Sequence, residues 1–310
     1  MTVNILFSAR PALWPVYEPL LRQNLLDAGL EFHLSTDIPP DQVDYVIYAP
    51  NGGLRDFTPY TRLKAVLSLW AGVESIADNE TLTVPLARMV DHGLTQGMTE
   101  WVVGHVLRYH LGMDQHITTQ DGTWEPDPPP LASERTVGIL GLGTLGTASA
   151  CALNSLGFDV IGWSRSAKEI AGITCLHGPE GLRETLSQAE ILVLLLPDTA
   201  ATENTLNTQT LALMPKGANI INPGRGPLID DEALLAALNA GQIGHATLDV
   251  FRVEPLPTDH TFWAHPNVTV TPHIASETRP PTAAQVIVEN IRRGEAGEPY
   301  LHLVDRTLGY

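Results

Sequence analysis

One short segment with three glycines constrains this 310-residue chain more than any other feature. It reads Gly141-Leu142-Gly143-Thr144-Leu145-Gly146, between an apolar run at 136–140 and a run of small residues at 147–150. Between a strand and a helix, the first glycine permits a tight turn, the second lets a pyrophosphate approach, and the third allows close packing. Free amides at the helix N-terminus attract the anion. The segment predicts a dinucleotide-binding domain, and the less specific alternative is a glycine-rich turn of any α/β protein.

The end of the following strand, predicted at 159–163, bears on the choice of dinucleotide. NAD enzymes usually carry an acidic residue there, about twenty residues past the glycines, which binds the ribose hydroxyl. This chain has Ser164, Arg165 and Ser166 instead. The Arg165 guanidinium can contact a 2′-phosphate, with the two serines and Lys168 as further donors. The sequence favours NADP(H) and leaves NAD(H) as a second possibility; the alternative is a solvated loop arginine.

Short apolar runs alternate with helical patterns along the whole chain, which is typical of parallel βα units. A chain of 310 residues exceeds the usual size of one hydrophobic core, so we expect two domains. A helix is predicted at 98–107, a stiff proline-rich loop at 126–130 and a last helix at 283–293. The predicted fold class is α/β, with two βα domains. A Rossmann-type doubly wound cofactor domain, 98–280, is inserted into a flavodoxin-like substrate domain made of 1–97 and the C-terminal return 281–310.

Composition excludes several classes of function. Lysine and arginine number 18 against 35 aspartates and glutamates, a formal charge of -17, which argues against nucleic acid and against an acidic membrane surface. The longest apolar run, 191–196, is too short to span a bilayer. Cys151 and Cys175 lack metal-ligand spacing, so no metal site is predicted. The first residues do not have the pattern of a signal peptide, and a cytoplasmic location is expected.

Three charged or titratable residues follow predicted strands: Arg225, Glu254 and His273. A histidine that titrates near neutrality can donate a proton to a carbonyl oxygen, and a neighbouring carboxylate stabilises the imidazolium. An arginine can grip a carboxylate through two parallel hydrogen bonds. Each residue also has an ordinary structural interpretation, and their spacing alone does not bring them together.

Five segments resemble, in order, those of the D-isomer-specific 2-hydroxyacid dehydrogenases, and the resemblance covers essentially the whole chain. They are the glycine segment, Asn222-Pro223-Gly224-Arg225-Gly226, Leu248-Asp249-Val250-Phe251, Glu254-Pro255-Leu256 and Pro272-His273-Ile274-Ala275. The chain looks closest to the bacterial glyoxylate/hydroxypyruvate reductase A group. Further similarities to that group are Trp163-Ser164-Arg165-Ser166, the segment 69–74, Val304-Asp305-Arg306 and the final Gly309-Tyr310.

The resemblance implies roles for individual residues. Arg225 would bind the substrate carboxylate and carbonyl, His273 would be the general acid and base, and Glu254 would orient it. Ala71 and Gly72 match a loop whose amides hold the carboxylate. Trp70 stands where many members have a small residue, so it would narrow the pocket or pack against its own domain.

The resemblance also implies a cofactor set and an oligomer. Asp249 would lie near the nicotinamide carboxamide. The full expected set is Gly141, Leu142, Gly143, Thr144, Leu145, Gly146, Ser164, Arg165, Ser166, Leu196, Pro197, Thr202, Asn222, Pro223, Gly224, Asp249, His273 and Ala275. A homodimer is expected, with the 98–107 helix and the 124–130 arm as its contacts.

The predicted function is an NADPH-preferring reductase of small 2-keto acids, acting on glyoxylate and hydroxypyruvate. Two alternatives stay open. One is an NAD(H)-sensing, corepressor-like binding protein on the same scaffold. The other is an NAD-dependent D-2-hydroxyacid dehydrogenase of D-lactate or phosphoglycerate type, against which the missing acidic residue after Trp163 argues.

Overall fold

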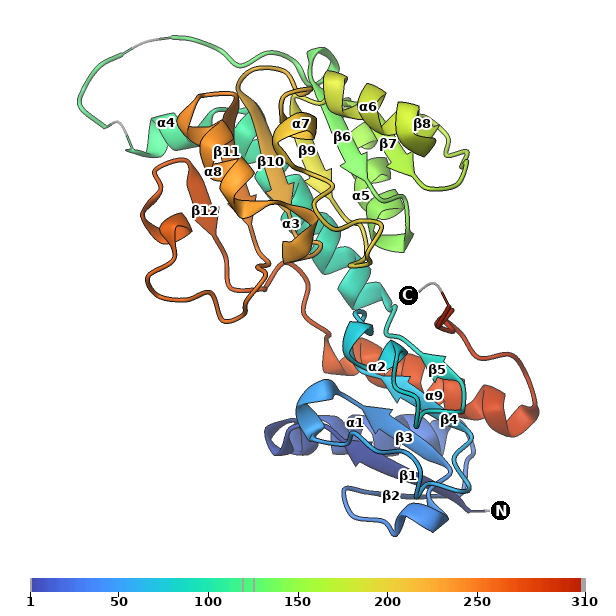
Figure 1. Cartoon of the computed structure of the whole chain (residues 1–310). Coiled ribbons are helices and arrows are strands. Elements are labelled where there is room, and N and C mark those ends of the chain that lie inside the picture. The colour runs from blue at the N-terminus through green and yellow to red at the C-terminus, as the bar shows by residue number, and fades with distance from the viewer. Residues whose placement is uncertain (1, 119, 125, 308–310) are drawn as a thin grey trace. The chain divides into compact units, whose positions relative to one another are not determined.

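The chain forms two compact units in the computed structural model, which describes residues 2–118, 120–124 and 126–307 (Figure 1). One unit comprises Met1–Leu94 and Thr278–Tyr310, and the other comprises Thr95–Glu277. The sequence predicts borders after residues 97 and 280, and the structure places them after Leu94 and Glu277.

The first unit is a parallel sheet with helices on both faces. Its strand order, β2-β1-β3-β4-β5, is flavodoxin-like, as the predicted fold class requires. Apolar residues of α1 and α9 pack together on one face, and α2 contributes to the core on the other. The elements are β1 (Val3–Ser8), α1 (Trp14–Asp27), β2 (Phe32–Ser35), β3 (Tyr45–Tyr48), β4 (Ala65–Ser68), α2 (Glu74–Ala77), β5 (Leu86–Ala87) and α9 (Pro280–Ala296).

The second unit is a doubly wound Rossmann-type sheet in the order β12-β11-β10-β9-β6-β7-β8. One face is covered by α3 and α5 and the other by α6, α7 and α8, because alternate strand residues belong to two separate apolar clusters. The elements are α3 (His92–His110), whose first residues belong to the first unit, α4 (Met113–Thr118), β6 (Thr136–Leu140), α5 (Thr144–Ser155), β7 (Asp159–Ser164), β8 (Thr174–His177), α6 (Gly178–Gln188), β9 (Ile191–Leu194), α7 (Thr208–Leu211), β10 (Ala218–Asn222), α8 (Asp231–Asn239), β11 (Ile243–Leu248) and β12 (Val268–Val270).

Two elements differ clearly in length from their predictions. The helix expected at 98–107 is the longer α3, which begins early because Asp91 Oδ1 accepts a hydrogen bond from Leu94 N at 2.6 Å. The apolar run 84–89, one of the short runs read as a strand of a βα unit, forms only the two residues of β5, since the following amides bond elsewhere: Arg88 N to His302 O and Met89 N to Trp70 O.

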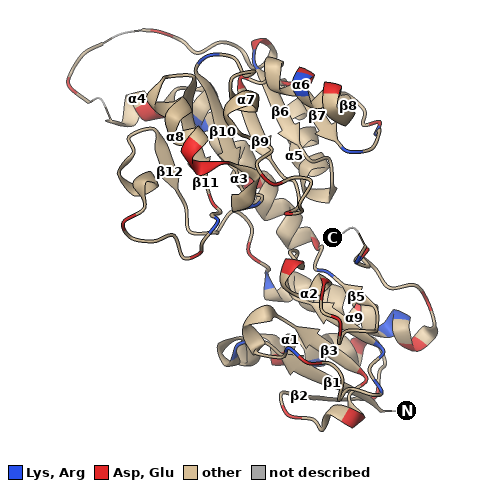
Figure 2. Cartoon of the chain, in the orientation of Figure 1, with Lys and Arg blue, Asp and Glu red and all other residues tan. Residues whose placement is uncertain are grey.

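Acidic residues occur throughout both units and outnumber the basic ones (Figure 2). Within the described part of the chain, every helix is too short or too polar to cross a membrane. The described residues also contain no group of three or more histidine, cysteine or acidic side chains placed to hold a metal ion.

Candidate active site

The candidate residues of the second unit lie at one edge of its sheet. All the strand pairs are parallel, so the carboxyl ends of the strands share that edge. The glycine segment follows β6, Arg225 follows β10, Glu254 follows β11 and His273 follows β12. Ligands of open parallel sheets bind beyond this edge, at the point where strand order reverses, which here is beside β6.

The glycine segment has the geometry of a phosphate-binding turn. Gly141 has a φ of +105°, and a Cβ there would lie 2.5 Å from Leu195 O. A Cβ on Gly146 would lie 1.8 Å from Gly141 O, so only glycine lets α5 pack against the strand. A Cβ on Gly143 would meet nothing within 4 Å, which leaves open space at the helix N-terminus. This open, amide-lined end fits a dinucleotide pyrophosphate.

The loop after β7 folds back toward the glycine segment. Ser164 is buried, and its Oγ donates to Ser166 O at 2.8 Å, so this hydroxyl shapes the loop instead of facing a ligand. Lys168 Nζ donates to Leu142 O. Arg165 is exposed at the end of the strand.

The loop after β9 contains Thr202, which the resemblance placed along the cofactor, and the side chain of Thr202 forms hydrogen bonds within this loop. Thr202 Oγ1 donates to Pro197 O at 2.7 Å and accepts from Thr199 N at 2.9 Å. Leu196 is buried against the sheet. The hydroxyl therefore holds the loop in shape.

The turn that carries Arg225 is built by a buried asparagine. Asn222 Oδ1 accepts from Gly224 N at 3.1 Å, and its Nδ2 donates to Arg225 O at 2.8 Å. Gly226 lets the turn approach the next loop, since a Cβ there would lie 2.0 Å from the carbonyl carbon of Phe251. Arg225 is partly exposed, and its Nη1 donates to Gly224 O at 2.7 Å.

His273 and Glu254 form a direct pair, with 2.7 Å between His273 Nδ1 and Glu254 Oε2. The second carboxylate oxygen accepts from Phe251 N at 2.9 Å, which fixes the carboxylate. The hydrogen bond to Glu254 raises the pKa of His273, although burial opposes the shift. Burial acts to raise the pKa of Glu254, but hydrogen bonds from His273 and the Phe251 amide together outweigh it and lower that pKa.

Arg225 completes this group electrostatically. Its positive charge lowers the pKa of both His273 and Glu254, because it lies close enough to both side chains for their charges to interact. A proton donor, a carboxylate that orients it and a planar cation thus share one sheet edge with the glycine segment. Such a set can bind an anion and protonate an oxygen.

Asp249 has a role that the sequence did not indicate. It is completely buried, and its carboxylate accepts hydrogen bonds from Thr271 Oγ1, Ile274 N and Ala275 N, on both sides of His273. The resemblance implies a place near the nicotinamide carboxamide for Asp249, and no role was predicted for Thr271. An aspartate directly after a strand has the same sequence signature whether it faces a ligand or its own loop.

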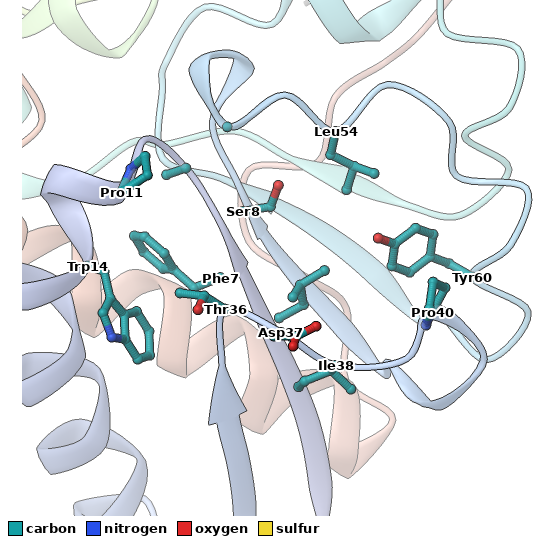
Figure 3. Close-up of a pocket in the computed structure, with 13 residues that line it drawn as sticks. Phe7, Ser8, Pro11, Trp14, Thr36, Asp37, Ile38, Pro40, Leu54 and Tyr60 are labelled. Atoms are coloured by element: carbon teal, nitrogen blue, oxygen red, sulfur yellow. The ribbon is translucent and has the colours of Figure 1, made fainter.

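The expected substrate residues Trp70, Ala71 and Gly72 belong to the first unit, after β4. Trp70 is 41% exposed, and its backbone is held by Ser68 Oγ, which accepts from Trp70 N at 3.0 Å. The same unit contains a half-open hollow of about 550 Å³ at the carboxyl ends of β1 and β2. Its walls include Phe7, Trp14 and Tyr60, whereas none of the three expected substrate residues lines it (Figure 3).

Comparisons with known proteins agree with this geometry. The family model described as "D-isomer specific 2-hydroxyacid dehydrogenase, NAD binding domain" matches residues 103–275. A curated relative from Yersinia enterocolitica named glyoxylate/hydroxypyruvate reductase A is 44% identical over 256 residues, covering 80% of this chain and 82% of the relative. One from Serratia proteamaculans with the same name is 43% identical over 257 residues, with the same coverage.

Solved structures are similar over the whole chain. A D-isomer specific 2-hydroxyacid dehydrogenase from Xanthobacter autotrophicus Py2, in complex with NADPH and MES, has a TM-score of 0.92 and 40% identity, with both chains covered completely. An NADPH-dependent glyoxylate/hydroxypyruvate reductase from Sinorhizobium meliloti, in complex with NADP and sulfate, has a TM-score of 0.84 and 32% identity, covering 100% of this chain and 99% of that one. The resemblance identified from the sequence is confirmed, and the chain belongs to the D-isomer specific 2-hydroxyacid dehydrogenases.

Proposed function

We propose that this protein is an NADPH-preferring reductase of small 2-keto acids, which converts glyoxylate to glycolate and hydroxypyruvate to D-glycerate. The observation that carries the proposal is the 2.7 Å pair of His273 and Glu254, with Arg225 beside it at the edge that bears the glycine segment. The names of relatives 41–44% identical support the two substrates.

The proton in this reaction is held by His273. Glu254 Oε2 accepts from Nδ1–H, which leaves Nε2–H to donate to the carbonyl oxygen of the substrate. The raised pKa of His273 keeps the imidazole protonated to higher pH than a free histidine, as a general acid near neutrality requires. A nicotinamide cofactor, when bound, supplies the hydride.

Arg225 binds the keto acid in this proposal. Its Nη1 donates to Gly224 O, which orients the guanidinium, and a planar guanidinium can bind a carboxylate through two parallel hydrogen bonds. Positive charge here also stabilises the negative charge that develops on the carbonyl oxygen.

For the cofactor we propose NADP(H), with NAD(H) used less well. Arg165 is exposed where NAD enzymes carry an acidic residue, and a guanidinium there favours a 2′-phosphate. Two similar structures, from Xanthobacter autotrophicus and Sinorhizobium meliloti, are described as complexes with NADPH and with NADP.

The experiment that tests the function is a panel of 2-keto acids assayed with NADPH and with NADH. We expect glyoxylate and hydroxypyruvate to be reduced, with NADPH the better donor. Tight NADPH binding with background turnover of every keto acid would favour the cofactor-sensing alternative. Turnover with NADH alone would favour the NAD-dependent alternative.

We also propose that the protein forms a homodimer. Large apolar side chains are exposed on α4, on the 124–130 arm and directly after that arm, with Ile117 70%, Trp124 92% and Leu131 69% exposed, as is typical of surfaces that bind a partner. The α3 face with Met98 and Val102 is buried in its own unit, so the arm is the better of the two expected contacts. Light scattering after size-exclusion chromatography tests this, and a wild-type monomer would contradict it.

The cellular location that we propose is the cytoplasm. Both cysteines, Cys151 and Cys175, are free thiols, as is common in a reducing compartment. Fractionation of the cells that express the protein tests the location, and recovery in an extracytoplasmic fraction would contradict it.

A further inference from the structure

The histidine loop has an unusual backbone. It runs from Thr271, directly after β12, to the buried Ala275, and His273 at its centre has a φ of +55°. Residues other than glycine rarely adopt this left-handed conformation, because their Cβ atom crowds the backbone. The surrounding structure must therefore hold the loop in place.

One buried carboxylate, that of Asp249, fixes the loop through hydrogen bonds. Asp249 Oδ1 accepts from Thr271 Oγ1 at 2.6 Å and from Ile274 N at 2.9 Å, and Oδ2 accepts from Ala275 N at 2.9 Å. The backbone carbonyl of Asp249 also accepts from His273 N at 2.9 Å. These hydrogen bonds reach the chain on both sides of the histidine.

Thr271 differs from the other donors to this carboxylate. Ile274 and Ala275 donate through backbone amides, which stay when their side chains are changed, whereas Thr271 donates through its hydroxyl. Hydrogen bonds to a buried charge are short and strong, and the 2.6 Å distance fits that class. Removing the hydroxyl leaves a buried carboxylate with one donor fewer, so the carboxylate must shift or draw the loop toward itself.

We propose that Thr271 is a positioning residue for keto-acid reduction. Its hydroxyl fixes the Asp249 carboxylate, which in turn holds the left-handed backbone of His273 so that the imidazole meets Glu254. This inference rests on the proposed function, because it assigns His273 the task of donating the proton. The hydrogen bonds of Thr271 reach Asp249 Oδ1, Leu248 O and the backbone N of His273, and none of them is to the imidazole or to the Glu254 carboxylate.

The test compares Thr271→Val, which keeps the shape of the side chain, with Thr271→Ser, which keeps the hydroxyl. Thr271→Ala is the second variant that lacks the hydroxyl, and it serves if the valine strains the fold. Thr185→Val is the matched control, since Thr185 is completely buried and its Oγ1 donates to Gly181 O at 2.8 Å within α6.

The first measurement needs neither cofactor nor substrate. The pKa of His273 is read by NMR on histidine-labelled protein, with the signal assigned by its absence in His273→Gln. The charged groups that act on His273 are Glu254, Arg225 and Asp249, all retained in these variants. We expect the pKa to fall toward its ordinary value in Thr271→Val and Thr271→Ala, because the contact with Glu254 loosens. Thr271→Ser and Thr185→Val should match the wild type.

The second measurement is the steady-state rate across pH. Thr271→Val and Thr271→Ala should lower kcat at least about tenfold, and by more than they raise KM for the keto acid, because a displaced acid donates poorly. Thr271→Ser should stay within about threefold of the wild type. An unchanged His273 pKa and kcat in Thr271→Val, or equal losses in Thr271→Val and Thr271→Ser, would overturn the proposal. Absence of keto-acid turnover in the wild type would refute the proposed function, while the NMR comparison would still decide whether Thr271 positions the histidine.

Discussion

The substitution Arg165→Ala should weaken the binding of NADPH to the protein without weakening the binding of NADH. Three donors other than the arginine were expected to help bind a 2′-phosphate, but the structure directs two of them into the protein. Ser164 Oγ donates to Ser166 O, and Lys168 Nζ donates to Leu142 O. Arg165 is an exposed residue that carries a positive charge in this loop, and we expect it to supply the largest local contribution to phosphate binding.

The size of the effect follows from the chemistry of the contact and from its exposure. A hydrogen bond to a charged group contributes about 1.5–3 kcal/mol. Exposure to water and salt moves an ion pair toward the low end, near ~1.5 kcal/mol, which corresponds to roughly a tenfold change in affinity. We thus expect the dissociation constant for NADPH to rise about tenfold in Arg165→Ala, and that for NADH to change less than about twofold.

The assay is titration of cofactor fluorescence, with Arg183→Ala as the control that removes an exposed arginine from α6. Added salt should erase much of the difference between wild type and Arg165→Ala for NADPH. An equal loss of affinity for both cofactors would refute the reasoning, because it would mean that Arg165 holds the loop instead of the phosphate.

Three further outcomes follow from the site. Arg225→Lys should lower kcat/KM at least about tenfold, because the point charge of a lysine ammonium cannot form the two parallel hydrogen bonds of a planar guanidinium. Wild-type kinetics in this variant would mean that Arg225 has only a structural role. Glu254→Gln should move the alkaline limb of the kcat profile to lower pH, since the hydrogen bond that raises the pKa of His273 loses its charge; an unmoved limb would refute the pairing. Gly226→Ala should reduce the free energy of unfolding by about 1–3 kcal/mol in denaturant titration, because its Cβ would meet the backbone of Phe251, and an unchanged midpoint would contradict that contact.

The sequence predicted best what local geometry determines. The glycine segment encodes its turn, its phosphate approach and its helix contact in residues 141–146, and the structure shows the corresponding close contacts at Gly141 and Gly146. The βα alternation likewise predicted two parallel sheets, because strands joined by crossover helices pair in parallel.

The sequence could not predict what depends on segments far apart in the chain. Arg225, Glu254 and His273 share one edge because β10, β11 and β12 are neighbours in the sheet, which their spacing does not reveal. The role of Asp249 depends on the loop 271–275 folding back over it. Ser164 is buried at the end of β7. The alternation of apolar and polar residues along a strand does not predict whether the side chain of its last residue faces the protein or the solvent.

The central claim is that His273, oriented by Glu254, donates the proton in NADPH-dependent reduction of a 2-keto acid. The most direct measurement is single-turnover NADPH oxidation with glyoxylate and with hydroxypyruvate, for wild type and His273→Gln, alongside NADPH affinity. We predict rapid oxidation in the wild type, a loss of about a hundredfold or more in His273→Gln, and NADPH affinity within about threefold. Oxidation at the wild-type rate in His273→Gln would contradict the account, as would a wild-type protein that binds NADPH and reduces neither keto acid.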